Sequence, residues 1–301
     1  MRVIITGGTG LVGTALSTYL VEKGYEVVTL SRSPNQAAAP AGVQVVQWDG
    51  KTAVNWGHLA NGAAAIINLA GASIAGGRWT EERKREIINS RVNAGKAVVE
   101  AITQASHKPE FLFQASAVGY YGNGGDQLLT ETAPIGSDFP ANVTQAWEPA
   151  TAAVEAMGVR RVVGRIGVVL SMNGGALPQM ALPFRLFAGG PVGSGQQWLS
   201  WIHLDDLVRA IHFFMQNPDT SGSYNLAAPE PVRNKAFGKV VGSVLKRPFF
   251  MPAPAFALKL LFGEMSTILL EGQRVSADKL QKAGFTFIYP AVEPALADLL
   301  G

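Results

Sequence analysis

Short apolar runs and longer segments of helical spacing alternate along the first half of the chain. The runs at 3–5, 26–30, 43–47, 63–69, 110–116 and 160–170 have the length and the β-branched content of buried strands. Between several of them, over 11–23, 80–105 and 142–157, the sequence favours helices that cover one face of a sheet. Strands that alternate with helices predict a doubly wound, parallel α/β sheet of the Rossmann type.

Local signals indicate where some of these elements begin, bend or end. Thr80 precedes two glutamates and is a typical N-cap, and Pro149 is expected to kink the helix over 142–157. Asp205 is expected to cap the helix that follows a strand beginning at Trp201. The Ala- and Pro-rich segment 35–42 is expected to be a loop.

A glycine-rich turn lies between the first strand and the first helix, over residues 6–13. Its spacing, Gly8-x-Gly10-x-x-Gly13, matches the dinucleotide-binding fingerprint in the strand–turn–helix context that this fingerprint requires. The first glycine would allow the tight turn, the second would let the backbone approach a pyrophosphate, and the third would let helix and strand pack closely. Since a helix N-terminus offers free N–H groups to phosphates, the turn predicts nucleotide binding.

The end of the second strand indicates which dinucleotide is bound. An NAD site usually carries an acidic residue there, but this chain has Ser31 and Arg32 instead. A guanidinium pairs well with the 2′-phosphate of NADP, so NADP is favoured over NAD. The alternative is an ordinary solvated arginine at a strand end.

Arg91 has two interpretations that the sequence leaves open. The apolar stripe expected for the helix over 80–105 consists of Ile88, Val92, Val99 and Ile102. Around the helix axis, Arg91 lies about one residue away from that stripe. Its side chain therefore either reaches a phosphate or borders the core.

Composition narrows the possible partners. With 48% hydrophobic and 16% charged residues, a net charge of +3 and no cysteine, the chain is typical of a globular protein without disulfides or thiolate metal sites. Its four histidines lack metal-ligand spacing, so no metal is expected. No basic stripe is interleaved with aromatics and no apolar window is long enough to span a bilayer, so neither nucleic acid nor a membrane is expected as a partner. No signal peptide is visible, and a cytoplasmic location is expected.

Several short motifs are spread along the whole chain. They are TGGTGLVG at 6–13, NLAG at 68–71, Ser116 with Tyr121-Gly122, WIHLDDL at 201–207, YNL at 224–226, RIGVVL at 165–170, LPFR at 182–185 and GGPVGSG at 189–195. Together these motifs resemble the extended and atypical short-chain dehydrogenase/reductase superfamily, of the NAD(P)-dependent epimerase/dehydratase type. The match looks closer still to its YfcH-like branch of epimerase family proteins, and it covers essentially the whole chain.

The resemblance implies NADP(H) in a Rossmann cleft, with the glycine turn at the pyrophosphate and Ser31 and Arg32 at the 2′-phosphate. Leu69 and Ala70 would lie along the cofactor, Arg91 near its phosphates and Val169 on its nicotinamide side. The full set of expected cofactor-binding residues is Gly7, Thr9, Gly10, Leu11, Val12, Gly13, Ser31, Arg32, Leu69, Ala70, Gly71, Arg91, Ala115 and Val169.

One departure from the family pattern concerns catalysis. Active members carry a Tyr-x-x-x-Lys pair after the serine strand, but residues 138–148 contain no tyrosine, and no lysine lies between Lys108 and Lys235. Ser116 with Tyr120 or Tyr121, whichever phenol points into the cleft, would substitute for the pair, and Tyr121 is the expected one; packing of the two tyrosines is the alternative. Glu148 is a further possible acid, although a helix-surface position is expected for it.

Two classes of function therefore stay open. The first is an NADP-dependent oxidoreductase or epimerase-like enzyme that acts on a small polar substrate. The second is a sensor or scaffold that binds NADP(H) without turnover. A nucleotide-sugar binder that uses NAD is a third, less favoured interpretation.

Residues 1–170, joined by 200–227, are expected to form the NADP-binding domain, and residues 171–199 and 228–301 a smaller C-terminal α/β substrate domain. The oligomeric state is left open.

Overall fold

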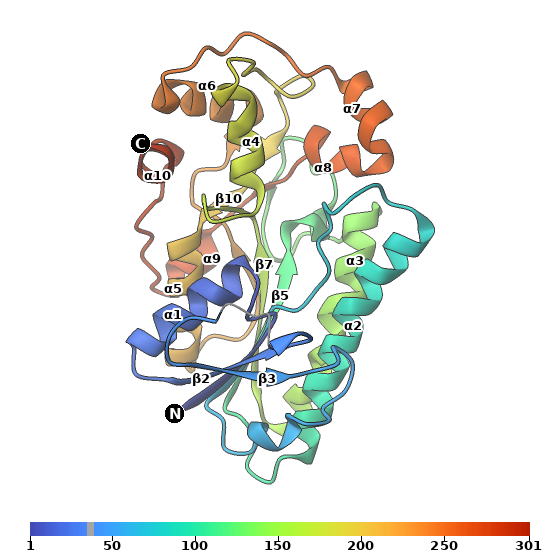
Figure 1. Ribbon diagram of the computed structural model, residues 1–301, viewed down its shortest axis with the longest axis vertical. Coiled ribbons are helices and arrows are strands. Elements are labelled where there is room, and N and C mark those ends of the chain that lie inside the picture. The colour runs from blue at the N-terminus through green and yellow to red at the C-terminus, as the bar shows by residue number, and fades with distance from the viewer. Residues whose placement is uncertain (35–38) are drawn as a thin grey trace.

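The computed structural model describes residues 1–34 and 39–301, and a seven-stranded parallel sheet forms its centre (Figure 1). The loop expected over 35–42 lies partly outside the described residues. The strand order is β11-β7-β5-β4-β1-β2-β3, and every neighbouring pair is parallel. The sheet strands are β1 (Arg2–Thr6), β2 (Glu26–Ser31), β3 (Val43–Gln47), β4 (Ala65–Asn68), β5 (Phe111–Ala117), β7 (Arg160–Ile166) and β11 (Gly222–Leu226).

Helices cover both faces of this sheet, so the predicted doubly wound Rossmann-type fold is confirmed. On one side α1 (Leu11–Glu22) packs beside α5 (Leu204–Gln216), and on the other α2 (Glu81–Gln104) packs against α3 (Phe139–Trp147) and the 3₁₀ helix η4 (Glu148–Met157) (Figure 1). Alternate residues of β1 supply the two cores, because successive strand side chains point to opposite faces. Val3 and Ile5 join the α1–α5 side, and Ile4 joins the α2 side.

The strand order reverses between β1 and β4, and this reversal positions the candidate site. Chain connections from β1 lead to β2 and β3 on one side, whereas β4, β5 and β7 extend on the other. In open α/β sheets, ligands bind in the crevice outside the carboxyl ends of the strands at such a switch point.

Smaller elements complete the opposite end of the molecule, where α4, α6, α7 and α8 lie at the top of Figure 1. Residues of α4, α6 and α10 (Val292–Leu300) form a third apolar cluster with β10, which includes Leu177, Phe184, Trp201 and Phe237, whereas α7 and α8 contribute no residue to it. The remaining elements of the described residues are β6 (Leu128–Leu129), β8 (Val168–Leu170), α4 (Ala176–Arg185), β9 (Trp198–Leu199), β10 (Trp201–His203), β12 (Val232–Arg233), α6 (Asn234–Leu245), α7 (Ala255–Phe262), α8 (Thr267–Leu270), β13 (Arg274–Val275), α9 (Asp278–Lys282) and α10 (Val292–Leu300), with 3₁₀ helices η2 (Gly57–Ala60), η3 (Val118–Tyr121) and η5 (Gly263–Ser266).

The helix expected over 142–157 begins earlier than predicted, and it changes from an α-helix to a 3₁₀ helix partway along. It begins at Phe139, because the Asp138 carboxylate accepts a hydrogen bond from the Ala141 N–H and caps the first turn. The α-helical part ends at Trp147, and the chain continues as a 3₁₀ helix from Glu148. Pro149 lacks the N–H that an α-helix needs, which accounts for the change.

The strand expected over 160–170 is interrupted at Gly167. The Gly167 N–H donates to the Leu226 carbonyl, and a Cβ atom at this position would lie 2.7 Å from the Ser200 carbonyl oxygen. Residues 168–170 therefore leave the central sheet and pair with β10 instead. The cap of α5 also differs from the prediction, since the His203 Nδ1 accepts from the Asp205 N–H.

His212 on α5 gives the fold a specific dependence on pH. Burial lowers the pKa of His212, with a smaller contribution from Lys23, and its Nε2 has no hydrogen-bond partner among the described residues. As the pH falls below about 6.5, the unfolded chain binds a proton that the folded chain resists, so the free energy of unfolding falls. We expect His212→Gln to remove up to about 1.4 kcal/mol per pH unit of this slope.

Urea unfolding at a series of pH values below 6.5 measures this slope. The matched control is His58→Gln, because His58 is exposed. A His212→Gln profile parallel to that of the wild type would contradict the prediction.

Candidate functional site

The glycine turn between β1 and α1 has its left-handed residue at Gly7, where φ is +69°. A Cβ atom at Gly8 would instead lie 2.5 Å from the Thr29 side chain on β2. The tight-turn role that the sequence pattern gave to Gly8 therefore belongs to Gly7, and Gly8 is needed for packing. The functional spacing is Gly7-x-x-Gly10-x-x-Gly13.

Gly13 and Gly10 bring the start of α1 close to the end of β1. A Cβ atom at Gly13 would lie 2.3 Å from the Gly7 carbonyl oxygen, so only glycine allows this approach. Gly10 is the N-cap of α1, and the helix start has neither a side-chain cap nor an acidic residue in its first turn. The amides of Leu11 and Val12 are thus left for an anion at the helix N-terminus.

The turn after β4 forms the adjacent wall of the same crevice. The Leu69 N–H donates to the Thr6 carbonyl at 3.2 Å, and the Ala70 N–H donates to the Thr6 hydroxyl, also at 3.2 Å. A Cβ atom at Gly7 would lie 2.9 Å from the Leu69 carbonyl carbon. The structure thereby brings the two small-residue turns together, at the carboxyl ends of β1 and β4.

Arg91 lies at this wall as a buried cation. A Cβ atom at Gly71 would lie 2.9 Å from the Arg91 Cζ, so the guanidinium rests against the glycine. The Arg91 Nη1 donates to the carbonyl oxygens of Ala72 at 3.0 Å and Ile87 at 2.9 Å, and its Cζ lies 4.8 Å from the centre of the Trp147 ring.

Neither Arg91 nor Trp147 has all its donors satisfied within the described residues. The Arg91 Nε and the Trp147 Nε1 lack partners, and no described carboxylate pairs with Arg91. Burial lowers the pKa of Arg91 to about 10, with a smaller contribution from Arg83. Buried polar groups are nearly always paired in proteins, so these donors fit an anionic ligand in the crevice.

The position of Arg91 also corrects the expected face of α2. The helix buries Ile87, Arg91, Ala94 and Val98. Of the expected stripe, Ile102 is buried as predicted, whereas Ile88, Val92 and Val99 are only partly buried. Small residues determine this face, since a Cβ atom at Gly95 would lie 2.7 Å from the Ala150 Cβ of η4.

The end of β2 holds the two residues expected at a 2′-phosphate. Ser31 is buried, and its hydroxyl accepts from the Ser33 N–H at 3.2 Å. Arg32 is exposed beside Gly50, at which a Cβ atom would lie 3.7 Å from the Arg32 Cδ. Within the described residues no carboxylate pairs with Arg32, so its guanidinium is available to a ligand.

Leu11 and Val169 both lie close to Gly175. A Cβ atom at Gly175 would lie 3.0 Å from the Leu11 Cδ2 and 3.9 Å from the Val169 carbonyl oxygen. Ala115 is buried on β5, one residue before Ser116. Thr9 and Gly10 are exposed on the turn itself.

A buried polar cluster begins at the end of β5 with Ser116. The Ser116 hydroxyl donates to the Glu148 Oε1 at 2.7 Å, and Arg165 on β7 donates to both Glu148 oxygens, from Nε at 3.0 Å and from Nη2 at 3.2 Å. The Arg165 Cζ lies 3.4 Å from the centre of the Tyr120 ring. The Glu148 side chain is only 14% exposed, so the expectation of a helix-surface glutamate is wrong.

Tyr121 belongs to the same cluster, with its hydroxyl directed into the protein. The hydroxyl donates to the Asn225 Oδ1 at 2.7 Å and accepts from the Arg165 Nη1 at 3.0 Å. Burial raises the pKa of Tyr121, although the Arg165 hydrogen bond acts in the opposite direction. The structure thus joins Ser116 and Tyr121 through Glu148 and Arg165.

Sequence reasoning missed Arg165 and Asn225 as members of this cluster. Arg165 offered one signal, because it interrupts the apolar part of its strand run after Arg160 and Arg161. Asn225 stood in the YNL motif of the family resemblance, but one amide in a short strand is compatible with many environments and did not indicate a contact with Tyr121.

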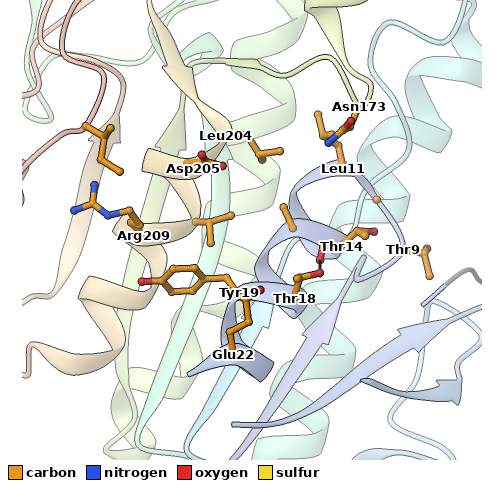
Figure 2. Close-up of a pocket in the computed structure, with 14 residues that line it drawn as sticks. Thr9, Leu11, Thr14, Thr18, Tyr19, Glu22, Asn173, Leu204, Asp205 and Arg209 are labelled. Carbon is orange, nitrogen blue, oxygen red and sulfur yellow. Dashed lines mark hydrogen bonds between the residues drawn. The ribbon is translucent and has the colours of Figure 1, made fainter. Parts of the chain in front are cut away.

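An open groove of about 650 Å³ lies between α1 and α5 (Figure 2). It begins at Thr9 and Leu11 beside the glycine turn, follows α1 past Thr14, and is bordered on the α5 side by Asp205 and Arg209. No motif in the sequence indicated this groove. The described residues include no group of three or more His, Asp or Glu side chains that could hold a metal ion, and none of the helices they form could cross a bilayer.

A Rossmann-type sheet with a glycine turn at its switch point defines the class of protein, and comparisons with known proteins narrow it. The model of the NAD dependent epimerase/dehydratase family matches residues 3–227, and that of a domain of unknown function, DUF1731, matches residues 253–299. The chain therefore belongs to the NAD dependent epimerase/dehydratase family.

Relatives of this chain match it over its whole length. Epimerase family protein YfhF of Bacillus subtilis is 41% identical over 301 residues, which cover 100% of this chain and 98% of the relative. The chloroplastic SDR39U1 homolog of Arabidopsis thaliana is 41% identical over 308 residues, covering 100% and 87%. The crystal structure of human epimerase family protein SDR39U1 with NADPH is 34% identical, has a TM-score of 0.90 and covers 100% of this chain and 99% of that one.

Proposed function

We propose that this chain is an NADP(H)-dependent oxidoreductase or epimerase-like enzyme that acts on a small polar substrate. The observation that carries the proposal is the buried guanidinium of Arg91, whose Nε has no partner among the described residues. It lies against Gly71, on the turn that packs against the glycine turn before the uncapped N-terminus of α1. A buried cation without a carboxylate is costly, and a dinucleotide pyrophosphate would satisfy both groups. The NADPH in the human relative's structure supports the same choice of ligand.

Each part of the crevice has a role in this proposal. Gly10 and the first amides of α1 hold the pyrophosphate together with Arg91, and Arg32 with Ser31 recognises the 2′-phosphate. Leu69 and Ala70 flank the dinucleotide, and Leu11, Ala115 and Val169 lie on its nicotinamide side. When bound, NADP(H) supplies the hydride donor or acceptor.

We propose Ser116 as the residue that contacts the substrate. Because its O–H is directed at Glu148, the Ser116 oxygen presents its lone pairs to a substrate hydroxyl, and Glu148 is placed to receive the Ser116 proton. Tyr121 was the other expected catalytic residue. Since its hydroxyl is already bonded to Asn225 and Arg165, we assign it the role of positioning Arg165.

We propose that the substrate is bound by residues 171–199 and 228–301, above the cofactor-binding part formed by 1–170 and 200–227. The arrangement of α4, α6, α7 and α8 at the carboxyl end of the sheet supports this division (Figure 1). The expected cytoplasmic location stays a prediction.

A second candidate function is an NADP(H) sensor or scaffold without turnover. The observation that favours it is the internal use of both candidate hydroxyls, since Ser116 donates to Glu148 and Tyr121 donates to Asn225. Steady oxidation of NADPH, or reduction of NADP⁺, with any member of a carbonyl and polyol panel would exclude this candidate.

Titration of the purified protein with NADPH and NADH, followed by nucleotide fluorescence, tests the proposed cofactor. We expect Arg32→Ala to weaken NADPH binding by about 10- to 100-fold, because a charge-assisted contact to the 2′-phosphate is lost. NADH affinity should change by less than about 3-fold, since this nucleotide lacks the phosphate.

Arg85→Ala is the matched control, because Arg85 is an exposed arginine of α2. Equal affinity of the wild type for NADPH and NADH would refute the preference for NADP. Absence of binding by either nucleotide would refute the proposed function itself.

A further inference from the structure

Helix α7 (Ala255–Phe262) is apolar on nearly all sides and contributes no buried residue. Phe256 is 75% exposed, Leu260 79% and Leu261 64%. Soluble proteins seldom expose several large apolar side chains together without a partner for them. In this respect α7 differs from the helices that pack against the central sheet, which bury apolar residues.

Further exposed apolar side chains lie next to α7 at the same end of the molecule. The N–H groups of Phe250 and Met251 both donate to the Gly189 carbonyl, so the segment leading into α7 runs beside the segment that follows α4 (Figure 1). We call this region the apolar end, and it consists of Leu182, Leu186, Phe187, Phe250, Met251, Phe256, Leu260 and Leu261, all exposed.

Basic side chains surround the apolar end. Residues 231–263 include six lysines and arginines and no aspartate or glutamate, although the whole chain has nearly equal numbers of both signs. Lys246 and Lys259 are exposed, and the Arg247 Cζ lies 4.4 Å from the centre of the Phe187 ring. Lys246, Arg247 and Lys259 therefore place positive charge at the apolar end. Arg233 pairs with Asp126, and Glu264, which directly follows this range, pairs with Lys84.

We propose that the apolar end docks on the surface of an anionic lipid bilayer. Large apolar side chains bordered by lysine and arginine are the combination that inserts into the boundary between headgroups and acyl chains. With eight residues, α7 is far too short to span a bilayer, so it would lie in the interface. The absence of a spanning segment, on which the expectation of no membrane partner rested, does not bear on this mode of binding.

The charge pattern favours a bilayer over the other occupants of such a surface. A second copy of the chain, packed about a twofold axis, would bring two copies of the same basic surface together, so that like charges would face one another. Aliphatic side chains such as Leu260 and Leu261 make no hydrogen bonds to bases or phosphates, so they add little to binding of nucleic acid.

Co-sedimentation with vesicles tests the proposal on the full-length protein. We expect it to pellet with vesicles that contain phosphatidylglycerol and to stay largely in solution with pure phosphatidylcholine, with binding weakened by salt. The Lys246→Gln/Lys259→Gln variant should bind phosphatidylglycerol vesicles about 30-fold more weakly. The Phe256→Ser/Leu260→Ser variant should lose at least about 10-fold.

Matched controls are Lys51→Gln/Lys96→Gln and Val54→Ser, which change exposed residues away from the apolar end and should bind like the wild type. None of the substituted residues is buried, so every variant is expected to fold, and circular dichroism melting of each variant verifies this. The proposal is overturned if wild-type protein ignores phosphatidylglycerol, or if the variants and controls bind alike. It is also overturned if analytical ultracentrifugation shows a dimer that Phe256→Ser/Leu260→Ser dissociates.

Discussion

Replacing Glu148 by alanine is expected to lower the free energy of unfolding by about 3 to 5 kcal/mol, because it leaves a buried cation without its partner. Arg165 donates two hydrogen bonds to Glu148, and it has no other described carboxylate within ion-pair distance. Burial alone would lower the pKa of Arg165, but its bonds to Glu148 and Tyr121 raise it above the ordinary value. An arginine side chain stays protonated at neutral pH even without its partner, so removal of Glu148 leaves a buried, charged guanidinium without a carboxylate.

Urea unfolding monitored by tryptophan fluorescence measures this change. The matched control is Glu155→Ala, because Glu155 lies on the same 3₁₀ helix as Glu148 and its side chain is 54% exposed. Its partner Arg161 on β7 is buried but keeps hydrogen bonds to Thr151 and to the Glu148 carbonyl, so we expect a loss of about 1 kcal/mol or less. Equal losses for the two variants would show that the Glu148–Arg165 pair has no special role in stability.

Gly13→Ala is expected to cost about 3 kcal/mol of stability and to abolish measurable NADPH binding. The added methyl group would lie 2.3 Å from the Gly7 carbonyl oxygen and 2.6 Å from the Gly8 Cα. Both contacts are to backbone atoms, so the strain is relieved only if α1 moves away from β1. That movement would open the turn that is proposed to hold the pyrophosphate.

Gly10→Ala separates these two effects. Its Cβ atom would meet only the Gly7 carbonyl oxygen, at 3.3 Å, and the backbone of Gly10 has an ordinary φ of −81°. We expect its unfolding free energy to stay within about 1 kcal/mol of the wild type, while NADPH affinity falls because the methyl group occupies the approach to the helix N-terminus. A stable Gly13→Ala protein that binds NADPH normally would contradict this account of the turn.

Much of the fold followed from local patterns. The first four strands, α1 and α2 lie within a few residues of the expected bounds, and Thr80 caps α2 as predicted, accepting from the Arg83 N–H. Apolar periodicity and capping are properties of neighbouring residues, so a sequence displays them directly. The residue types at the glycine turn and at the end of β2 were visible for the same reason.

The buried polar cluster could not be read in this way. Glu148 and Arg165 are 17 residues apart, and Tyr121 and Asn225 are 104 apart. Taken alone, a glutamate next to a proline and an arginine in a strand are both compatible with exposed positions. Only the contact between Glu148 and Arg165 in the folded chain shows that both side chains are buried. The sequence likewise did not reveal that the strand expected over 160–170 is interrupted at Gly167, because the interruption depends on the close approach of the distant Ser200.

By itself, the sequence determined the alternation of strands and helices, the glycine turn and the basic residue after β2, because each depends on the spacing of residues close in the chain. The tertiary structure decided which glycine makes the tight turn, which face of α2 is buried, and that Ser116, Glu148, Arg165 and Tyr121 form one cluster. It also decided that the apolar residues of α7 remain uncovered. Burial and pairing of this kind depend on contacts between distant segments, and these exist only once the chain has folded.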